Sequence, residues 1–247
     1  MAQMKYYYEL TISSSPHVHS PVTTRTIMRD VIIALLPALI GSVVFFGSRV
    51  LIVTTVSVAS CVFIEWAYCK LTKQHSKTYD LSAVVTGFLL AYVCPPTIDY
   101  WIIVLGALFA IGLVKMLFGG IGRNVVNPAL AGRAFMFSWP VAMSTWIKAG
   151  FDNAATIQDN TASILAVDGA TAATPLAAMH QGQLPGVSLL DMFLGNVGGC
   201  IGETSALALL IGFAYLLVRK VITWHIPVAF IGSFAACYLL FTGFDVT

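Results

Sequence analysis

The sequence predicts an all-α protein that crosses a membrane several times. Hydrophobic residues make up 58% of the 247 residues and charged residues only 10%, whereas soluble domains carry about 25% charged residues. The mean hydropathy is +0.85. Several apolar stretches approach the roughly 20 residues that a helix needs to cross a bilayer. These observations exclude an ordinary soluble domain and indicate a polytopic transmembrane helical protein.

Seven apolar stretches are predicted to span the membrane. The third is short and ends at Pro95-Pro96, and the fifth contains Arg133. Both are therefore expected to be broken or re-entrant helices, which are tolerated where protein surrounds them. The predicted spans are 31–47, 50–69, 81–94, 100–118, 128–145, 197–218 and 221–241.

The spans divide the chain into four parts. Residues 1–30 are polar and lack the short hydrophobic core of a cleavable signal, so they are expected to remain as a cytoplasmic N-terminal segment. Residues 31–145 form a first five-helix membrane unit. Residues 146–196 are too long for an ordinary helix connection and are expected to form an ordered extracytoplasmic loop. Residues 197–247 begin a second helical half.

The distribution of basic residues predicts the orientation. With the N-terminus in the cytoplasm, the outer side carries only Arg49 and Lys148, and the positive-inside rule favours this arrangement. The loop 146–196 then lies outside the cytoplasm. The cytoplasmic basic residues are Lys5, Arg25, Arg29, Lys70, Lys73, Lys77, Arg123, Arg219 and Lys220.

Cysteine and histidine patterns predict no metal or iron–sulfur site. The five cysteines lie in or beside apolar stretches without C-x-x-C spacing, so small apolar packing is their expected use. His17 and His19 form an H-x-H pair without further ligands, which is weak support for metal binding. The net charge of +2 says little on its own, and no nucleic-acid partner is expected.

Thr174 stands out in the long polar loop. Pro175 follows it, so Thr174 is expected to cap a short helix that begins at Pro175. A phosphate ester on its hydroxyl would lie at the positive end of that helix. Asp168 is close enough in sequence to hold a metal ion or to orient the segment during such a modification. A simple helix cap is the more common use of a Thr-Pro pair.

The turn that precedes the fifth span is a second candidate. It reads GGIGRNVVNPALAGR, and Asn127 before Pro128 again predicts a helix cap followed by proline. The positive end of that helix, beside Arg123 and Arg133, could hold an anion or the edge of a flavin. A tight turn made by the glycines, with arginines that follow the positive-inside rule, explains the same residues without a ligand.

Ionisable residues in or beside spans are the third group of candidates. Glu203, Glu65 and Asp80 raise the question of ion coupling, because an acid within a span is costly and usually pairs or lines a wet path. Gly195, Gly198, Gly199 and Gly202 have the four-residue separations that allow close helix contact, and they predict packing at the start of the sixth span.

Four stretches carry a resemblance to a known family. The run from Asp168 to Thr174, DGATAAT, resembles a flavinylation motif, although Ala172 stands where glycine is frequent. The other three are SSSPH at 13–17 with RDVIIALLP at 29–37, GGIGRNVVNPA at 119–129, and GGCIGETSA at 198–206. These stretches are similar to the RnfD/NqrB family of membrane subunits, and the similarity extends over the whole chain. The D-type subunits of Rnf complexes match better, because B-type subunits have a longer N-terminal region.

The resemblance implies a cofactor and partners. Thr174 would carry FMN through a phosphoester bond, installed outside the cytoplasm by a flavin transferase, with Asp168, Thr171, Ala173 and Pro175 as the rest of the motif. A second, noncovalent flavin such as riboflavin would lie in the membrane, and Arg123, Asn124 and Asn127 are candidate residues for its site. Iron–sulfur, NAD-binding and other flavin-bearing subunits would be the partners, because this chain shows no motif for those groups.

The implied function is electron transport coupled to Na⁺ or H⁺ translocation, between ferredoxin and NAD⁺ in a prokaryotic cell membrane. This chain would act as an electron carrier without catalytic residues of its own. The family is expected to have ten spans in two five-helix halves, so the second half is incomplete in the present sequence. A solute channel or transporter with discontinuous helices is the main alternative, and a structural scaffold is the third.

Overall fold

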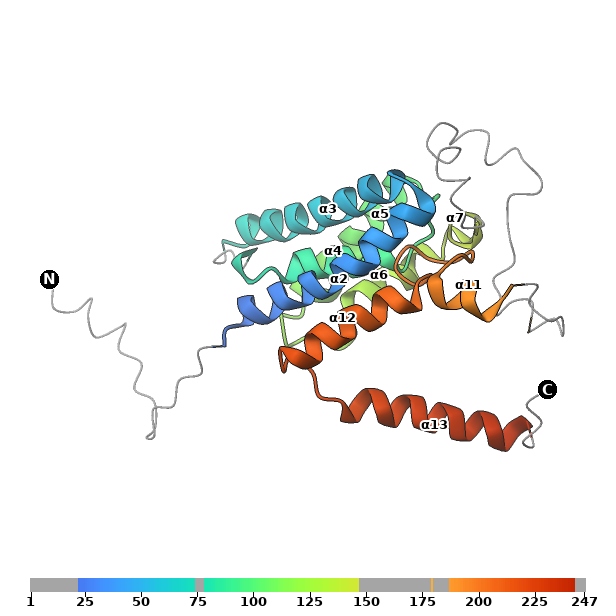
Figure 1. The fold of residues 1–247 in the computed structure, drawn as a ribbon. Helices are drawn as coiled ribbons and strands as arrows, with labels where there is room; N and C mark the ends of the chain where they lie inside the picture. Colours follow the sequence, from blue (N-terminus) through green and yellow to red (C-terminus); the bar gives the residue numbers. More distant parts are fainter. Residues whose placement is uncertain (1–21, 74–77, 147–178, 180–186, 243–247) are drawn as a thin grey trace, which may run out of the picture.

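The fold is a bundle of helices in a computed structural model that describes residues 22–73, 78–146, 179 and 187–242 (Figure 1). No β-strand occurs within these ranges. The elements are α2 (Thr24–Phe46), α3 (Arg49–Leu71), η1 (Thr78–Asp80), α4 (Ser82–Tyr92), α5 (Tyr100–Ala107), η2 (Leu108–Met116), α6 (Pro128–Met136), α7 (Pro140–Ser144), α11 (Leu189–Leu194), α12 (Ala206–Val218) and α13 (His225–Thr242).

Each of the seven predicted spans contains helix. Two helices, α2 and α3, are long and apolar enough to cross a membrane by themselves, with 23 residues each. The helix α2 begins at Thr24, earlier than predicted, because the Thr23 hydroxyl accepts a hydrogen bond from the Thr26 amide and caps it. Its first turns are polar, so hydropathy did not include them. The shorter apolar helices are Ser82–Tyr92, Tyr100–Met116, Ala206–Val218 and His225–Phe241.

The predicted breaks in the third and fifth spans are confirmed. The helix α4 ends at Tyr92 after 11 residues, and Pro95 and Pro96 follow it in a buried loop. The fifth span divides into α6 and α7, and Pro140 occupies the first turn of α7. Proline lacks the backbone N–H that would continue α6 through this point, so the chain restarts a helix instead.

The start of the sixth span was predicted wrongly. The helix α12 begins at Ala206, and residues 195–205 form turns instead of helix. Gly195 ends α11 in the left-handed region, with a φ of 107°, which glycine adopts without steric cost. The Ser205 hydroxyl accepts from the Ala208 amide and caps α12. The spaced glycines therefore do not form a helix–helix packing motif.

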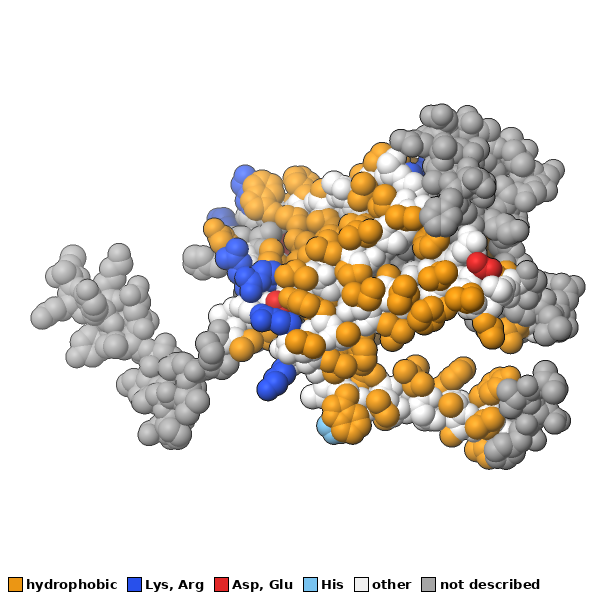
Figure 2. All heavy atoms as spheres, viewed as in Figure 1, with side chains coloured by type: hydrophobic (Ala, Val, Ile, Leu, Met, Phe, Trp, Pro, Cys, Tyr) orange, Lys and Arg blue, Asp and Glu red, His pale blue; other side chains and the backbone are white. Residues whose placement is uncertain are grey.

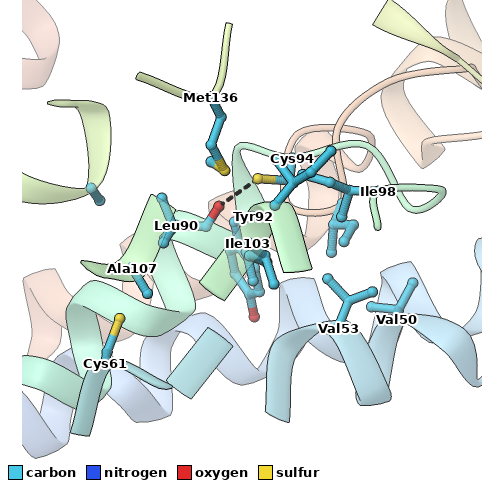
Figure 3. Close-up of a cluster of buried hydrophobic side chains, with 14 of the residues drawn as sticks. Val50, Val53, Cys61, Leu90, Tyr92, Cys94, Ile98, Ile103, Ala107 and Met136 are labelled. Carbon is cyan, nitrogen blue, oxygen red and sulfur yellow. Dashed lines mark hydrogen bonds between the residues drawn. The ribbon is translucent and has the colours of Figure 1, made fainter. Parts of the chain in front are cut away.

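The core lies where α3, α4, α5 and α6 meet. Figure 3 shows side chains of these elements converging, including Val50 and Val53 of α3, Leu90 of α4 and Ile103 of α5. All four are fully buried. The helix α2 packs against both α3 and α12, which joins the C-terminal part to this core.

The helix α13 lies apart from the bundle in Figure 1. Large apolar side chains along it are exposed, among them Phe230 at 73% and Phe241 at 91%. The bundle that positions the candidate sites therefore consists of α2 to α7 with α11 and α12.

Candidate functional site

The predicted flavin attachment segment lies outside the described residues. This applies to Asp168, Thr171, Ala173, Thr174 and Pro175. The described chain ends before this segment beside α7, where the hydroxyls of Thr97 and Thr145 lie 3.0 Å apart. It resumes before α11, which Ser188 caps by accepting from the Asp191 amide. Both helices lie at one end of the bundle in Figure 1.

Two non-helical segments meet inside the bundle, namely the loop after α4 and the turn 195–205 before α12. The Ile201 amide donates to the Cys94 carbonyl and the Gly202 amide to the Tyr92 carbonyl, each at 3.0 Å. The Ser42 hydroxyl of α2 donates to the carbonyls of Ala38 and Ile201. The carbonyls at the end of a helix lack intrahelical hydrogen-bond donors. Here backbone amides of the turn 195–205 act as donors to the carbonyls at the end of α4. Irregular backbone at this depth is tolerated because protein surrounds it.

Gly202→Ala should destabilise the fold at this crossing. A Cβ at position 202 would lie 2.5 Å from Tyr92 side-chain atoms, and overpacking of this kind costs about 1 to 3 kcal/mol. Thermal unfolding of the purified chain in detergent should show a lower midpoint for Gly202→Ala. Gly232→Ala is the matched control in α13, where a Cβ meets nothing within 4 Å. Equal midpoints for the two variants would contradict this close contact between the turn and α4.

Arg49 holds the loop that follows α4. Its side chain is only 6% exposed and donates to the carbonyls of Pro96, Thr97 and Ile98, at 3.0, 3.1 and 3.3 Å. The sequence indicated only that Arg49 lies on the outer side of the membrane. Its partners lie almost 50 residues further along the chain, so no local pattern could have identified them.

A buried ion pair lies between α3 and η2. The Lys115 ammonium group is 2.9 Å from a Glu65 carboxylate oxygen and donates to the Ser82 hydroxyl at 2.7 Å. Glu65 and Lys115 are each 2% exposed. Lys115 lies in a nine-residue π-helix, η2. Such helices are rare in proteins overall, and those that occur are often found at functional sites. Of the three acids singled out by sequence, Glu65 therefore has a buried cationic partner.

The other two acids occupy different elements. Asp80 ends η1 and is half-buried, whereas Glu203 is exposed in the turn before α12. The expectation that Glu203 lies inside a span helix was wrong, because that helix begins only at Ala206. No group of three His, Cys, Asp or Glu side chains positioned for a metal ion occurs in the described parts of the chain.

The glycine-rich turn before α6 is a surface turn. The Asn127 side chain accepts from the Ala129 amide at 3.0 Å, which confirms the predicted cap before Pro128. The Asn124 side-chain oxygen is buried and has no hydrogen-bond partner. Arg123 is exposed, and its side chain lies beside Gly119. The structure thus brings Arg123 and Asn124 into one turn, while the Asn127 oxygen is already used by the helix.

Basic side chains gather at one end of the bundle, as Figure 2 shows. Asp30 is 4% exposed there and accepts two hydrogen bonds from the Arg219 guanidinium, at 3.1 and 3.2 Å. This pair joins α2 to the end of α12, and no local sequence pattern indicated it. The exposed basic residues at this end are Arg25, Arg29, Lys70, Lys73, Arg123, Arg219 and Lys220.

Comparison with known proteins gives consistent matches. The sequence model of the NQR2, RnfD, RnfE family matches residues 11–247. The chain is 45% identical over 235 residues to the D subunit of the Na⁺-translocating ferredoxin:NAD⁺ oxidoreductase complex of Acetobacterium woodii. The match covers 94% of this chain and 69% of that protein.

Two further relatives have similar names. The D subunit of the proton-translocating ferredoxin:NAD⁺ oxidoreductase complex of Clostridium ljungdahlii is 39% identical, over 90% of this chain and 66% of the relative. The D subunit of the ion-translocating oxidoreductase complex of Vibrio atlanticus is 36% identical, over 94% of this chain and 74% of the relative. The chain thus spans about two thirds to three quarters of the length of these proteins.

Proposed function

The chain belongs to the NQR2, RnfD, RnfE family of membrane proteins, and from that premise we propose that it is the D-type subunit of an ion-translocating electron-transport complex. The observation that carries this proposal is the match over nearly the whole chain to relatives named as D subunits of ferredoxin:NAD⁺ oxidoreductase complexes. Electron transfer between ferredoxin and NAD⁺ would involve partner subunits, because this sequence has neither a dinucleotide fingerprint nor a cysteine cluster.

Within that complex, the chain would carry FMN on Thr174. The DGATAAT run from Asp168 to Thr174 supports this, together with Pro175, which would start a helix whose positive end faces the phosphate. The flavin would relay single electrons, and the protein would position it. A flavin transferase would install it with Asp168 and Ala173 as the recognition residues.

The orientation proposed for Thr174 is extracytoplasmic. The described exposed basic residues gather at one end of the bundle (Figure 2), and positive residues favour the cytoplasmic side. The chain enters and leaves the Thr174 segment beside α7 and α11, at the other end in Figure 1. This arrangement supports a flavin outside the cytoplasm in a prokaryotic cell membrane.

Glu65 is the preferred candidate for ion coupling. Its carboxylate is enclosed in the bundle with Lys115 and Ser82, where the approach of a cation or proton would compete with the lysine. Asp80 and Glu203 remain weaker candidates, because Asp80 lies in a short turn and Glu203 is exposed. The ion of this chain stays open between Na⁺ and H⁺, because the Acetobacterium relative is named as Na⁺-translocating and the Clostridium relative as proton-translocating.

A second, noncovalent flavin such as riboflavin is a subsidiary proposal. The buried, unpaired Asn124 oxygen favours the turn before α6, because it could accept a hydrogen bond from a flavin ring N–H. Arg123 would lie at the edge of that site, and Asn127 would act through its helix cap.

In-gel fluorescence tests the covalent flavin. The chain, coexpressed with a flavin transferase and separated under denaturing conditions, should give a band that fluoresces under ultraviolet light. Thr171→Ala is the matched control, because it removes a hydroxyl from the same motif and should leave most of the fluorescence. Thr174→Ala should remove it completely, since no other hydroxyl in the motif would carry the ester.

A dark wild-type band would contradict the covalent flavin. It would favour the alternative of a solute channel or transporter, whose substrate path would follow the discontinuous helices α4 and α11–α12. A fluorescent band in Thr174→Ala but not in Thr171→Ala would show that the ester is on Thr171 and not on Thr174.

A further inference from the structure

We propose that the basic end of the bundle binds an anionic phospholipid at one site, between the start of α2 and the end of α3. The lipid phosphate contacts Arg25 and Lys70, and the acyl chains lie along exposed aromatic side chains of α3. The proposal goes beyond the proposed function, because it needs only that the chain lies in a membrane. Three features support it, namely positive charge without acidic partners, the aromatic rings beside that charge and an apolar stripe that continues from the rings.

The basic side chains at this site form no ion pair within the described residues. Neither of the two pairs found there includes Arg25 or Lys70. The short helix η1, which contacts both α2 and α3, contributes one half-buried acid, Asp80. The carboxylate of Asp30 is already bound by Arg219. The site is therefore positive as a whole, and an anion would reduce the repulsion between its cations. The exposed cations at these two helix ends are Arg25, Arg29, Lys70 and Lys73.

Aromatic rings contact the two central cations where carboxylates would otherwise be expected. The Arg25 guanidinium lies 5.6 Å from the centre of the Tyr79 ring, and the Lys70 ammonium group lies 4.8 Å from the centre of the Trp66 ring. Both rings are exposed, Tyr79 at 77% and Trp66 at 45%. A ring attracts a cation through its quadrupole and carries no net charge. Each cation therefore keeps its charge for a phosphate.

An apolar stripe on α3 continues from the site toward the membrane interior. Phe63, Trp66 and Lys70 are separated by three and four residues, which places them on one side of the helix, and the two rings lie 5.9 Å apart. Phe63 is 64% exposed. Trp66 precedes the end of α3 at Leu71 by about 8 Å along the helix axis, which suits the interfacial region where tryptophan is enriched. In Figure 2 the basic side chains border the apolar side of the bundle in the same way.

A phospholipid fits this surface better than a protein partner does. A soluble acidic protein would reach the basic end of the bundle but would leave the rings of Phe63 and Trp66 uncovered. An apolar membrane helix would cover those rings but would leave the cations without an anion. An anionic lipid meets both requirements with one molecule, because its phosphate lies directly above its acyl chains. Basic residues beside membrane helices attract anionic lipids through their charge, and apolar contacts add to the binding.

Brominated lipids test the site in the intact chain. Bromine on an acyl chain quenches tryptophan fluorescence at short range. The chain is reconstituted in phosphatidylcholine bilayers that contain an equal fraction of either brominated phosphatidylglycerol or brominated phosphatidylcholine. The anionic lipid should quench more strongly, and Trp66→Phe should remove this excess.

Trp101→Phe is the matched control for that measurement. Trp101 is 52% exposed and lies beside Trp139 at the start of α7, on other elements than the site. Its replacement should leave the excess quenching by phosphatidylglycerol unchanged. Equal quenching by the two brominated lipids would overturn the proposal, as would an excess that survives Trp66→Phe.

A charge variant tests the phosphate contact. The measurement is the concentration of phosphatidylglycerol that gives half of the maximal rise in the thermal unfolding midpoint in detergent. Lys70→Gln should raise that concentration about fivefold. Lys220→Gln, which removes an exposed lysine after α12, should leave it unchanged. Equal increases in both variants would reveal a general attraction without a site and overturn the proposal. The same stabilisation by glycerol phosphate would overturn it too, because the occupant would be a soluble phosphate.

Discussion

Lys115→Ala should give the largest loss of stability of any single substitution proposed for this chain. The change leaves the Glu65 carboxylate buried at 2% exposure without its cation. Breaking a buried pair in this way costs about 3 to 5 kcal/mol. The same substitution removes the donor to Ser82 at the start of α4. Chemical unfolding of the purified chain in detergent should show a lower midpoint denaturant concentration for Lys115→Ala than for the wild type. The yield of purified protein should also be lower.

Replacing both partners is the control for that prediction. The double variant Glu65→Met, Lys115→Met places two apolar side chains of similar length in the same space. It should recover most of the stability, because no unpaired charge remains. If the double variant is as unstable as Lys115→Ala, the loss comes from packing and the ion pair is not its cause.

The double variant also tests the proposed coupling role of Glu65. In the assembled complex, ions moved per electron should fall if the carboxylate takes part in translocation. An unchanged ratio in a correctly folded double variant would remove Glu65 from the ion path and leave the pair a structural role. Glu203→Gln gives the parallel measurement for the exposed acid.

Thr174→Ala should abolish electron transfer through this subunit. The hydroxyl is the proposed attachment point of the flavin, so the variant would lack the carrier while every described contact of the bundle remains. Ferredoxin-dependent NAD⁺ reduction by the complex should fall to background, with subunit stoichiometry and thermal unfolding unchanged. Thr171→Ala should retain most of the activity. A Thr174→Ala complex with normal activity would exclude the flavin from the electron path.

Local sequence patterns predicted the helices and several of their ends. Apolar length located α3 and α13 closely, and Asn127-Pro128 predicted the cap that the structure shows at α6. Pro95 and Pro96 correctly indicated that α4 is short. These features depend on backbone chemistry within a few residues, which a single sequence contains.

Features that depend on distant contacts could not be predicted in the same way. Glu65 was singled out, but its partner Lys115 is 50 residues away and enters the bundle from a π-helix. Arg49 was assigned to the outer side of the membrane, and its sequence neighbours did not indicate that the side chain donates to three carbonyls of the loop after α4. The glycines at 195–202 were assigned to a helix, because hydropathy does not show that the backbone there pairs with the end of α4. The Thr174 motif rests on sequence alone, since its residues lie outside the described ranges.

Peptide mass spectrometry of this chain, isolated from the active complex, tests the central claim most directly. The account predicts that the peptide containing Thr174 carries the mass of one FMN less one water, with fragment ions that place the addition on Thr174. The Thr171 side chain should be unmodified. An unmodified Thr174 peptide from a complex that still transfers electrons to NAD⁺ would contradict the account.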